Sequence, residues 1–289
     1  MIPISLNDAP LAVTNPDAWT RGEPGPVAVG DLWLLSWNGL GVGLGVISAR
    51  LPGYVLLWPA MLPGDDARAP AIRVADSPLG VAVDVWPTRE TGVGDALLHR
   101  RICPLLTPRL MAGVGDAIDE GEVPPLPFAP PASDVVAQRV RDEEMIDHWD
   151  AVCLTQWPTT AATAPRLNRE AAREYGLTPS WLSALLEIGA ADAVALFVGD
   201  RTLSLGQADV ISAELGALAP ELLAPAQDTA ATALLDPRWK TDVLALAARR
   251  ELPEAAARDL VISEFALAAR SSNSSDDRLS AVFARLLAD

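Results

Sequence analysis

The stretch GDLWLLSWNGLGVGLGVISARLPGYVLLWP, residues 30–59, decides the fold of the first half of this chain. Two apolar runs rich in Leu and Trp, 31–37 and 54–58, flank a centre in which glycine recurs at every second position, 39–45. Short apolar runs bounded by turn signals are typical of buried strands. The glycine spacing does not match the G-x-G-x-x-G dinucleotide fingerprint, and it predicts a flexible loop between two strands.

The residues that follow extend this strand pattern. Leu51-Pro52-Gly53 is a turn signal and predicts a hairpin between 44–49 and 54–58. Further short strands, separated by Gly and Pro turns, are predicted over 71–74, 81–86 and 96–102. Short strands at this spacing indicate a small antiparallel barrel or sandwich.

The candidate barrel is bordered by segments of other kinds. Thr107 as N-cap and Pro108 at the first helical position predict a helix that runs to residue 120. The prolines that follow exclude both a helix and a central strand, so we expect a semi-rigid linker over 122–133. Residues 1–26 are rich in Pro, Asn, Asp and Gly, and they predict an irregular arm. Helical periodicity then continues almost to the end of the chain, over 134–289.

The charge of the chain narrows its possible partners. The sequence holds 22 Lys and Arg against 38 Asp and Glu, a formal net charge of −16. RNA or DNA is a poor electrostatic match for such a protein unless a local basic patch exists. Lys240 is the single lysine; apart from the two histidines, every other basic residue is Arg.

Cysteine usage and the N-terminus bear on the compartment. Cys103 and Cys153 form no C-x-x-C motif, which favours two free thiols in a cytosolic protein. The N-terminus, MIPISLNDAP, lacks the basic and apolar regions of a signal peptide. No apolar run reaches the roughly 18 residues that a membrane span needs. We therefore expect a cytoplasmic protein with no membrane partner.

One pair of side chains has metal-ligand spacing. Glu144 and His148 stand at i and i+4 of a predicted helix. The H-E-x-x-H order is absent and no other His is near in sequence, so a solvated acidic face is the better interpretation. We expect neither a metal nor a cofactor.

Three features of the first half carry a family resemblance. They are the opening Gly30-Asp31-Leu32-Trp33, the strand and proline at 55–59, and a closing strand and helix over 97–117. In these features the chain resembles the MazF/PemK family of ribonuclease toxins, over roughly a third of its length. The resemblance implies an SH3-like barrel, a dimer, and cleavage of single-stranded RNA.

The chain departs from this family at the catalytic positions. The family has an Arg in an R-P-[VC] step after the glycine loop, but 41–46 contains no Arg. The family's Thr or Ser follows the strand's proline, but Pro59 is followed by Ala60 and Met61. RNA cleavage of this type needs a base or nucleophile-activating pair and a cation that offsets charge developing on the phosphate. If the chain is a ribonuclease, the candidates for relocated catalytic groups are Arg50, Arg73 and His99.

A second resemblance covers 167–223. It begins with LNREAAREYGLTPSWLSALLEIG, where Gly176 would supply a turn between two helices, and 203–223 match a following helix pair. This region resembles Xre/Cro-type helix-turn-helix proteins. The DNA-binding candidates on its second helix are Thr178, Ser180, Trp181 and Ser183. Four basic and eight acidic residues lie between 166 and 223, so we expect DNA binding to be weak.

These observations predict an α+β protein. The predicted parts are an arm (1–26), an SH3-like MazF/PemK-type β-barrel (27–121), a Pro-rich linker (122–133) and an all-α C-terminal domain (134–289) with a helix-turn-helix-like core. The predicted function is that of a non-enzymatic bacterial regulatory or interaction protein related to toxin–antitoxin components. Its barrel would serve dimerisation or partner binding, with a toxin or antitoxin as partner and no RNA ligand. Two alternatives stay open: a MazF/PemK-like endoribonuclease with relocated catalytic residues, and an Xre-type transcriptional repressor.

Overall fold

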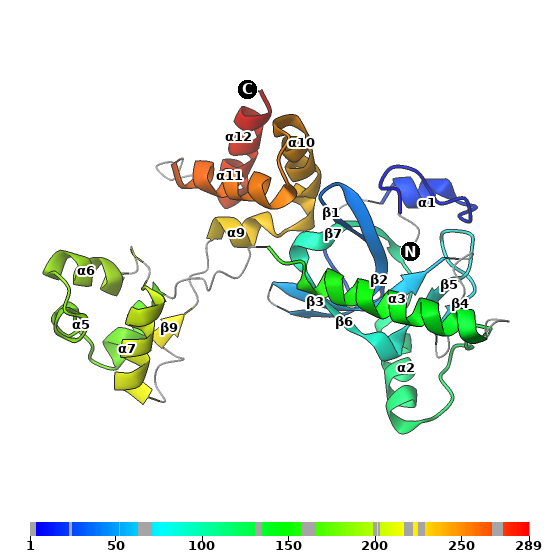
Figure 1. Cartoon of the computed structure of the whole chain (residues 1–289), viewed down its shortest axis with the longest axis horizontal. Helices are drawn as coiled ribbons and strands as arrows, with labels where there is room; N and C mark the ends of the chain where they lie inside the picture. The colour runs from blue at the N-terminus through cyan, green and yellow to red at the C-terminus, as the bar shows by residue number, and fades with distance from the viewer. Residues whose placement is uncertain are drawn as a thin grey trace. The chain divides into compact units, whose positions relative to one another are not determined.

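The computed structural model has an α+β architecture, with an antiparallel sheet in its N-terminal half and helices in its C-terminal half (Figure 1). It describes residues 4–22, 25–51, 53–62, 71–130, 135–157, 166–198, 201, 203–216, 222–224, 229–267 and 274–288. The chain forms two compact units: Met1–Trp157 together with Thr232–Asp289, and Pro158–Ala231. We call them the sheet unit and the inserted unit.

The sheet unit is built on seven antiparallel strands in the order β4-β5-β3-β2-β1-β7, with β6 also paired to β3. Among the described strands, β4 and β7 stand at opposite ends of this path, so the sheet is not closed and the predicted SH3-like barrel is not confirmed. The strands are β1 (Asp31–Trp37), β2 (Leu40–Leu51), β3 (Tyr54–Met61), β4 (Ile72–Val74), β5 (Val83–Val85), β6 (Thr91–Gly94) and β7 (Leu98–Pro104).

Local turn chemistry produces the two central hairpins. Leu51 pairs with Tyr54 across a turn in which Gly53 has φ 84°, so the predicted β2–β3 hairpin is confirmed. Asn38 and Gly39 both have positive φ, 51° and 74°, and join β1 to β2. Asn-Gly is the pair that two-residue hairpin turns favour, because both residues tolerate this backbone region.

The prediction of a loop over 39–45 is wrong, because β2 begins at Leu40 and includes the alternating glycines. A Cβ on Gly41 would lie 2.3 Å from the carbonyl oxygen of Ile4, and one on Gly43 would lie 2.9 Å from the indole of Trp149. These glycines therefore leave room for other parts of the chain to lie directly on the strand. The pattern reflects close packing on a strand rather than flexibility.

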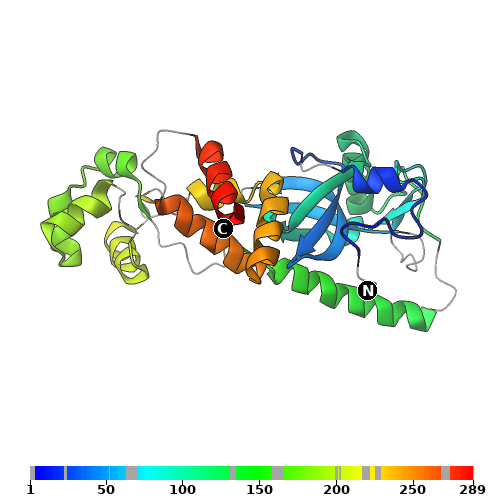
Figure 2. The same cartoon turned by 90° about the horizontal axis from the view of Figure 1, so that it is seen from above.

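Both faces of the sheet are buried, which is why six of the seven residues of β1 are buried. Leu32 and Leu34 face one core, which also holds Trp19 of α1 (Pro16–Thr20) and residues of α2 (Pro108–Glu120). Trp33 and Leu35 face a second core, covered by α3 (Val135–Leu154). Figures 1 and 2 both show α3 lying along the sheet. The predicted helix after Thr107 is confirmed as α2, with the Thr107 hydroxyl accepting the Leu110 N–H at its start.

The proline-rich segment differs from the predicted linker. Its residues up to Pro130 run along the edge of β4: the Arg73 N–H donates to Pro127 O at 2.7 Å, and the Ala129 N–H donates to Ala71 O at 2.8 Å. Ala129 is buried. The edge strand is covered because carbonyls and the non-proline N–H groups of this segment still form hydrogen bonds. Residues 131–134 lie outside the described part.

The last helices belong to the sheet unit and not to a separate helical domain starting at 134. These elements are a 3-10 turn η4 (Pro237–Trp239), α10 (Lys240–Arg250), α11 (Glu254–Leu267) and α12 (Ser275–Ala288). They pack on one another through buried apolar residues, with the rings of Trp239 and Phe283 stacked at 5.5 Å. We call residues 232–289 the C-terminal cap. This cap packs in one unit with strands from near the start of the chain.

The inserted unit has its own apolar core, which includes Leu182, Leu196 and Ile211. Gly176, with φ 70°, forms the predicted turn between the first two helices: Leu177 N–H donates to Ala172 O and Gly176 N–H donates to Arg173 O, a Schellman ending. The elements are β8 (Arg166–Leu167), α4 (Arg169–Glu174), α5 (Pro179–Leu186), α6 (Ala190–Val198), α7 (Leu205–Leu215) and β9 (Leu223–Ala224); α9 (Thr229–Leu234) leads back.

Within the described ranges, no single helix is both long enough and apolar enough to span a membrane. The bent pair α5 and α6 passes that test when its two helices are taken together.

Candidate functional site

The three residues nominated for ribonuclease chemistry lie on three different strands. Arg50, on β2, has its guanidinium 3.8 Å from the carboxylate of buried Asp95. Arg73, on β4, donates twice to Asp84, at 2.7 and 2.8 Å. The hydrogen bond to Asp84 raises the pKa of Arg73. Bidentate charge-assisted pairs of this kind fix the Arg side chain. Arg73 therefore has a structural role at the edge of the sheet.

His99, on β7, is the third nominated residue. Its Nδ1 lies 3.1 Å from the Ser36 hydroxyl. Burial, followed by the charges of Lys240 and Arg100, lowers the pKa of His99 to about 4. The imidazole is therefore neutral at neutral pH, and as a neutral ring it cannot offset charge on a phosphate.

Of the four residues nominated for DNA binding, two have local structural roles. The Thr178 hydroxyl caps α5 by accepting the Trp181 N–H, and the Ser183 hydroxyl donates to Ile188 O at 2.7 Å. Trp181 is half-buried and packs on the inserted unit's core. Ser180 is exposed. The helix thus presents few polar groups able to reach a base edge.

The two residues with metal-ligand spacing, Glu144 and His148, have different surroundings. His148 Nε2 lies 2.6 Å from Val42 O of β2, and Glu144 is exposed. Within the described ranges, no cluster of three or more His, Cys, Asp or Glu has the placement needed to hold a metal ion.

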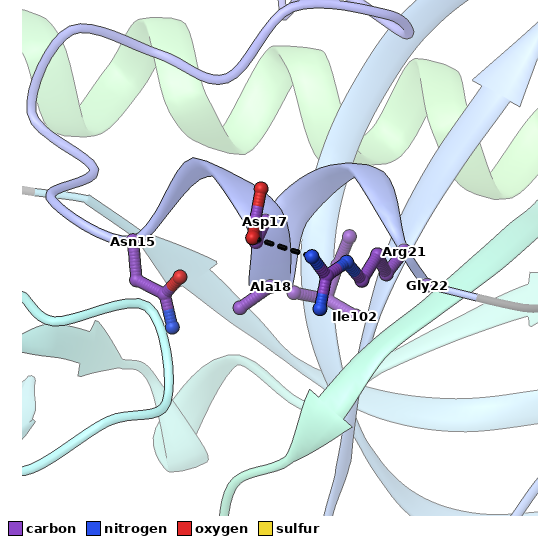
Figure 3. Close-up of a pocket in the computed structure, with 6 residues that line it drawn as sticks. All are labelled: Asn15, Asp17, Ala18, Arg21, Gly22 and Ile102. Atoms are coloured by element: carbon purple, nitrogen blue, oxygen red, sulfur yellow. Dashed lines mark hydrogen bonds and ion pairs between the residues drawn. The ribbon is translucent and has the colours of Figure 1, made fainter.

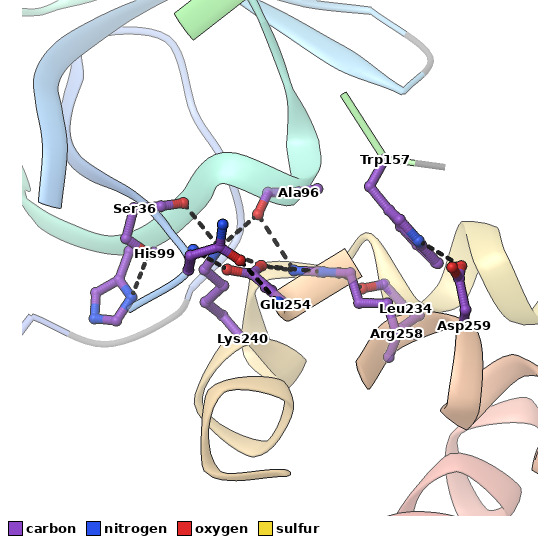
Figure 4. Close-up of polar contacts among 10 residues, drawn as sticks. Ser36, Ala96, His99, Trp157, Leu234, Lys240, Glu254, Arg258 and Asp259 are labelled. Carbon is purple, nitrogen blue, oxygen red and sulfur yellow. Dashed lines mark hydrogen bonds and ion pairs between the residues drawn. The ribbon is translucent and has the colours of Figure 1, made fainter. Parts of the chain in front are cut away.

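The densest polar cluster was not predicted from the sequence. It lies where α10 and α11 meet the ends of β1 and β7, and its charged members are Lys240, Glu254 and Arg258 (Figure 4). All three are buried, with at most 2 % of each residue exposed. Charged side chains are buried to this extent almost only when they are paired and hydrogen-bonded.

Lys240 joins the cap to the sheet. Its ammonium donates to Ser36 O at 2.9 Å, to Ala96 O at 2.8 Å and to Glu254 Oε1 at 2.6 Å. It also lies 5.5 Å from the centre of the Trp37 ring, a cation–π distance. Three acceptors use all three ammonium donors.

Glu254 begins α11 and holds the tip of the β1–β2 hairpin. Its backbone N–H donates to the Asn38 side-chain oxygen at 2.8 Å, and the Asn38 N–H donates to its Oε2 at 3.1 Å. Asn38 thus caps a helix that lies 216 residues away in sequence. The Asn-Gly turn therefore has two roles, closing the hairpin and docking the cap.

Arg258, one turn after Glu254, completes the cluster. Its guanidinium donates to Glu254 Oε1, to Ala96 O at 3.2 Å and to Leu234 O at 2.8 Å. Its Cζ lies 5.2 Å from the centre of the Trp157 ring. Each carbonyl that it binds belongs to a different part of the chain.

The pKa and the hydrogen bonds of Lys240 indicate a structural role for the cluster. Burial lowers the pKa of Lys240 to about 7, because desolvation outweighs the attraction of Glu254. A lysine with such a pKa is a candidate nucleophile or base when a substrate can reach it. Lys240 is 1 % exposed, and its donors are taken. The arrangement holds the cap on the sheet.

The structure links two nominated residues to this cluster and separates the third. His99 touches Ser36, whose carbonyl accepts from Lys240, and Arg50 pairs with Asp95, which precedes Ala96. Arg73 lies at the far end of the strand order. The sequence held two signals of the cluster: a single lysine in an Arg-rich chain, and the i, i+4 spacing of Glu254 and Arg258.

An open hollow lies beside α1 on the sheet unit (Figure 3). Its most polar groups, Asp17 and Arg21, form an exposed ion pair with each other at 2.7 Å. An exposed pair of this kind contributes little and is screened by salt. The lining residues are Asn15, Asp17, Ala18, Arg21, Gly22 and Ile102.

Comparison with known proteins places the chain in no established group. No family model, no curated protein and no solved structure matches it.

Proposed function

We propose that the chain is a regulatory or interaction protein related to toxin–antitoxin components, and that it does not act as a ribonuclease. The sheet unit would provide a scaffold for dimerisation or for binding a toxin or antitoxin. One observation carries the proposal: three arginines of the sheet lie against its buried carboxylates. Arg73 pairs with Asp84, Arg101 pairs with Asp31, and Arg50 faces Asp95.

The physical reason concerns the cation that phosphoryl chemistry requires. The charge of a guanidinium paired with a buried carboxylate is already offset by that partner, so it attracts a phosphate less. If the guanidinium moved to the phosphate, the carboxylate would stay buried without a counter-charge. Asp31 and Asp84 are each at most 4 % exposed. These arginines therefore hold the sheet together, and the scaffold role agrees with the negative charge of the whole chain.

The finer fold assignments belong to this proposal. An SH3-like barrel is supported by the pairing of β3. Two different strands pair with it, β5 near Ala60 and β6 near Val55. An Xre-like core is supported by α4, the Gly176 turn and α5, followed by α6 and α7 around one apolar core. We infer that this helix-turn-helix-like unit packs or binds a partner and does not read an operator.

One observation favours the ribonuclease alternative. Arg50 is half-exposed and reaches the cluster through Asp95, while His99 reaches it through Ser36. A neutral imidazole near a cation is a possible base. The repressor alternative rests on the α4–Gly176–α5 geometry and is opposed by the acidic composition of the unit.

The experiment compares three properties of the purified full chain. We expect no cleavage of a long single-stranded RNA at a defined short sequence, and a light-scattering mass of twice the 30.5 kDa chain. DNA retention should be micromolar or weaker near physiological salt, as for non-specific binding. Sequence-defined cleavage that is lost in Arg50→Ala or His99→Ala, but kept in Arg89→Ala, would replace this proposal with the ribonuclease.

A further inference from the structure

The chain leaves the sheet unit for the inserted unit at a firmly held residue. Trp157 is the last residue of the first part of the sheet unit, and it is 4 % exposed. Its indole Nε1 donates to Asp259 Oδ1 at 2.9 Å, and its ring faces the guanidinium of Arg258 at 5.2 Å. A Trp at such a position anchors both by its apolar ring and by its N–H.

The chain returns to the sheet unit at a residue held by the same arginine. The sheet unit resumes at Thr232, and two residues later the buried Leu234 has its carbonyl bound by Arg258 Nη1 at 2.8 Å. Arg258 thus lies over the Trp157 ring at the departing end and donates one of its N–H groups to the returning end (Figure 4).

The same guanidinium also contacts the sheet. Its Nη2 donates to Ala96 O, which accepts from Lys240 as well, and both Nη2 and Nε donate to Glu254. The guanidinium is planar and its donors are fixed in a fork, so it cannot follow one partner without misaligning the others. With 2 % of the residue exposed, water does not replace a lost partner, and each broken bond carries its full desolvation cost.

We propose that Arg258 is a clasp that couples the two ends of the inserted segment to the contact between the cap and the sheet. Moving Trp157 away from Leu234 misaligns the guanidinium and weakens its bonds to Ala96 and Glu254. Coupling of this kind is reciprocal, so loosening the cap also loosens both ends. A partner that binds the inserted unit and changes the spacing of its ends would thereby act on the docking of the cap.

The test is amide hydrogen exchange on the full chain. Trp157→Phe keeps an aromatic ring but removes the N–H donated to Asp259. We expect exchange to rise in 150–157, and also by roughly tenfold in 232–239 and 94–98, since one lost buried hydrogen bond corresponds to about that factor. Asp259→Asn keeps an oxygen acceptor and should leave all three segments near their wild-type exchange, whereas Asp259→Leu should reproduce Trp157→Phe.

Two further variants complete the design. Arg258→Lys keeps the charge but loses the fork, and it should raise exchange in 150–157, 232–239 and 94–98 together. If this variant does not fold, the Trp157 and Asp259 variants decide alone. Arg285→Lys changes an ion pair between α12 and α11 in which the Arg side chain is half-exposed, and it should change none of the three segments.

A rise confined to 150–157 in Trp157→Phe would overturn the proposal, because the two ends would then be held independently. A uniform rise that includes α12 and the core of the inserted unit would overturn it as well, because that pattern is general destabilisation and not coupling through Arg258.

Discussion

The stability of the sheet unit should depend strongly on the negative charge of Glu254. Its side chain is fully buried, and four hydrogen bonds end on its carboxylate: one from Lys240, two from Arg258 and one from the Asn38 N–H. Glu254→Gln conserves the shape of the side chain and removes the charge. Two cations then remain buried without a counter-ion, for which we expect a loss of roughly 3–5 kcal/mol in the free energy of unfolding.

The measurement is urea unfolding followed by tryptophan fluorescence. Eight of the nine tryptophans belong to the sheet unit and one, Trp181, to the inserted unit, so the signal reports mainly on the unit that contains Glu254. The matched control is Glu264→Gln on the same helix, where the carboxylate pairs with the half-exposed Arg285. We expect the control to cost less than about 1 kcal/mol, as exposed ion pairs do.

Equal losses of unfolding free energy in Glu254→Gln and Glu264→Gln would refute the reasoning. The burial of Glu254 and its four hydrogen bonds would then add nothing to the stability that an exposed ion pair gives. A fall in the slope of the unfolding transition without a shift of its midpoint would also count against it. Such a change indicates a difference in the surface exposed on unfolding and not a loss of stability.

Four further substitutions, each at a single position, have expected outcomes. Gly43→Ala should destabilise the sheet unit by roughly 1–3 kcal/mol because its Cβ meets the Trp149 indole at 2.9 Å, whereas Gly115→Ala, in open space on α2, should stabilise by about 0.5–1 kcal/mol in the same urea assay. Burial raises the pKa of Asp95; the charge of Arg50 opposes this shift and that of Asp236 adds to it, and Asp95 Oδ1 accepts no hydrogen bond from the described residues. Asp95→Asn should therefore raise the thermal midpoint at pH 7, with the gain shrinking as pH falls through the raised pKa. A constant gain down to pH 3 would exclude this cause. Glu251 ends α10 with φ 52°, so Glu251→Gly should stabilise by about 1 kcal/mol, and a loss of stability by calorimetry would contradict the left-handed cap.

Local signals in the sequence predicted the elements that local chemistry decides. The turn at Gly53, the cap at Thr107 and the turn at Gly176 are each set by one or two residues and their neighbours, and all three appear at the expected positions. The loop predicted over 39–45 failed for a complementary reason. Glycine lowers strand propensity, but here Trp149 needs the space that glycine leaves, and that partner lies more than a hundred residues away.

The same limit applies to the division of the chain and to the polar cluster. Periodicity identifies an apolar face but does not say which surface will cover it, so the cap helices were assigned to a helical domain although they dock on the sheet. Lys240 binds a carbonyl 204 residues away. The sequence shows that Lys240 is the single lysine, but nothing in the neighbouring sequence indicates its acceptors.

The chemistry of the acceptors explains why charged residues form this joint. Ser36, Ala96 and Leu234 each direct a backbone carbonyl into the contact between cap and sheet, and Lys240 and Arg258 supply the donors. An apolar replacement of a buried ion triad is often neutral, but here it would leave these carbonyls buried without partners, at about 1–3 kcal/mol each. Two cations need a counter-charge once they are buried, and Glu254 provides it from the first turn of α11, where the helix dipole also favours an acidic residue. Backbone groups at the end of a sheet thus require donors, the donors require a carboxylate, and the carboxylate fixes where the last helices dock.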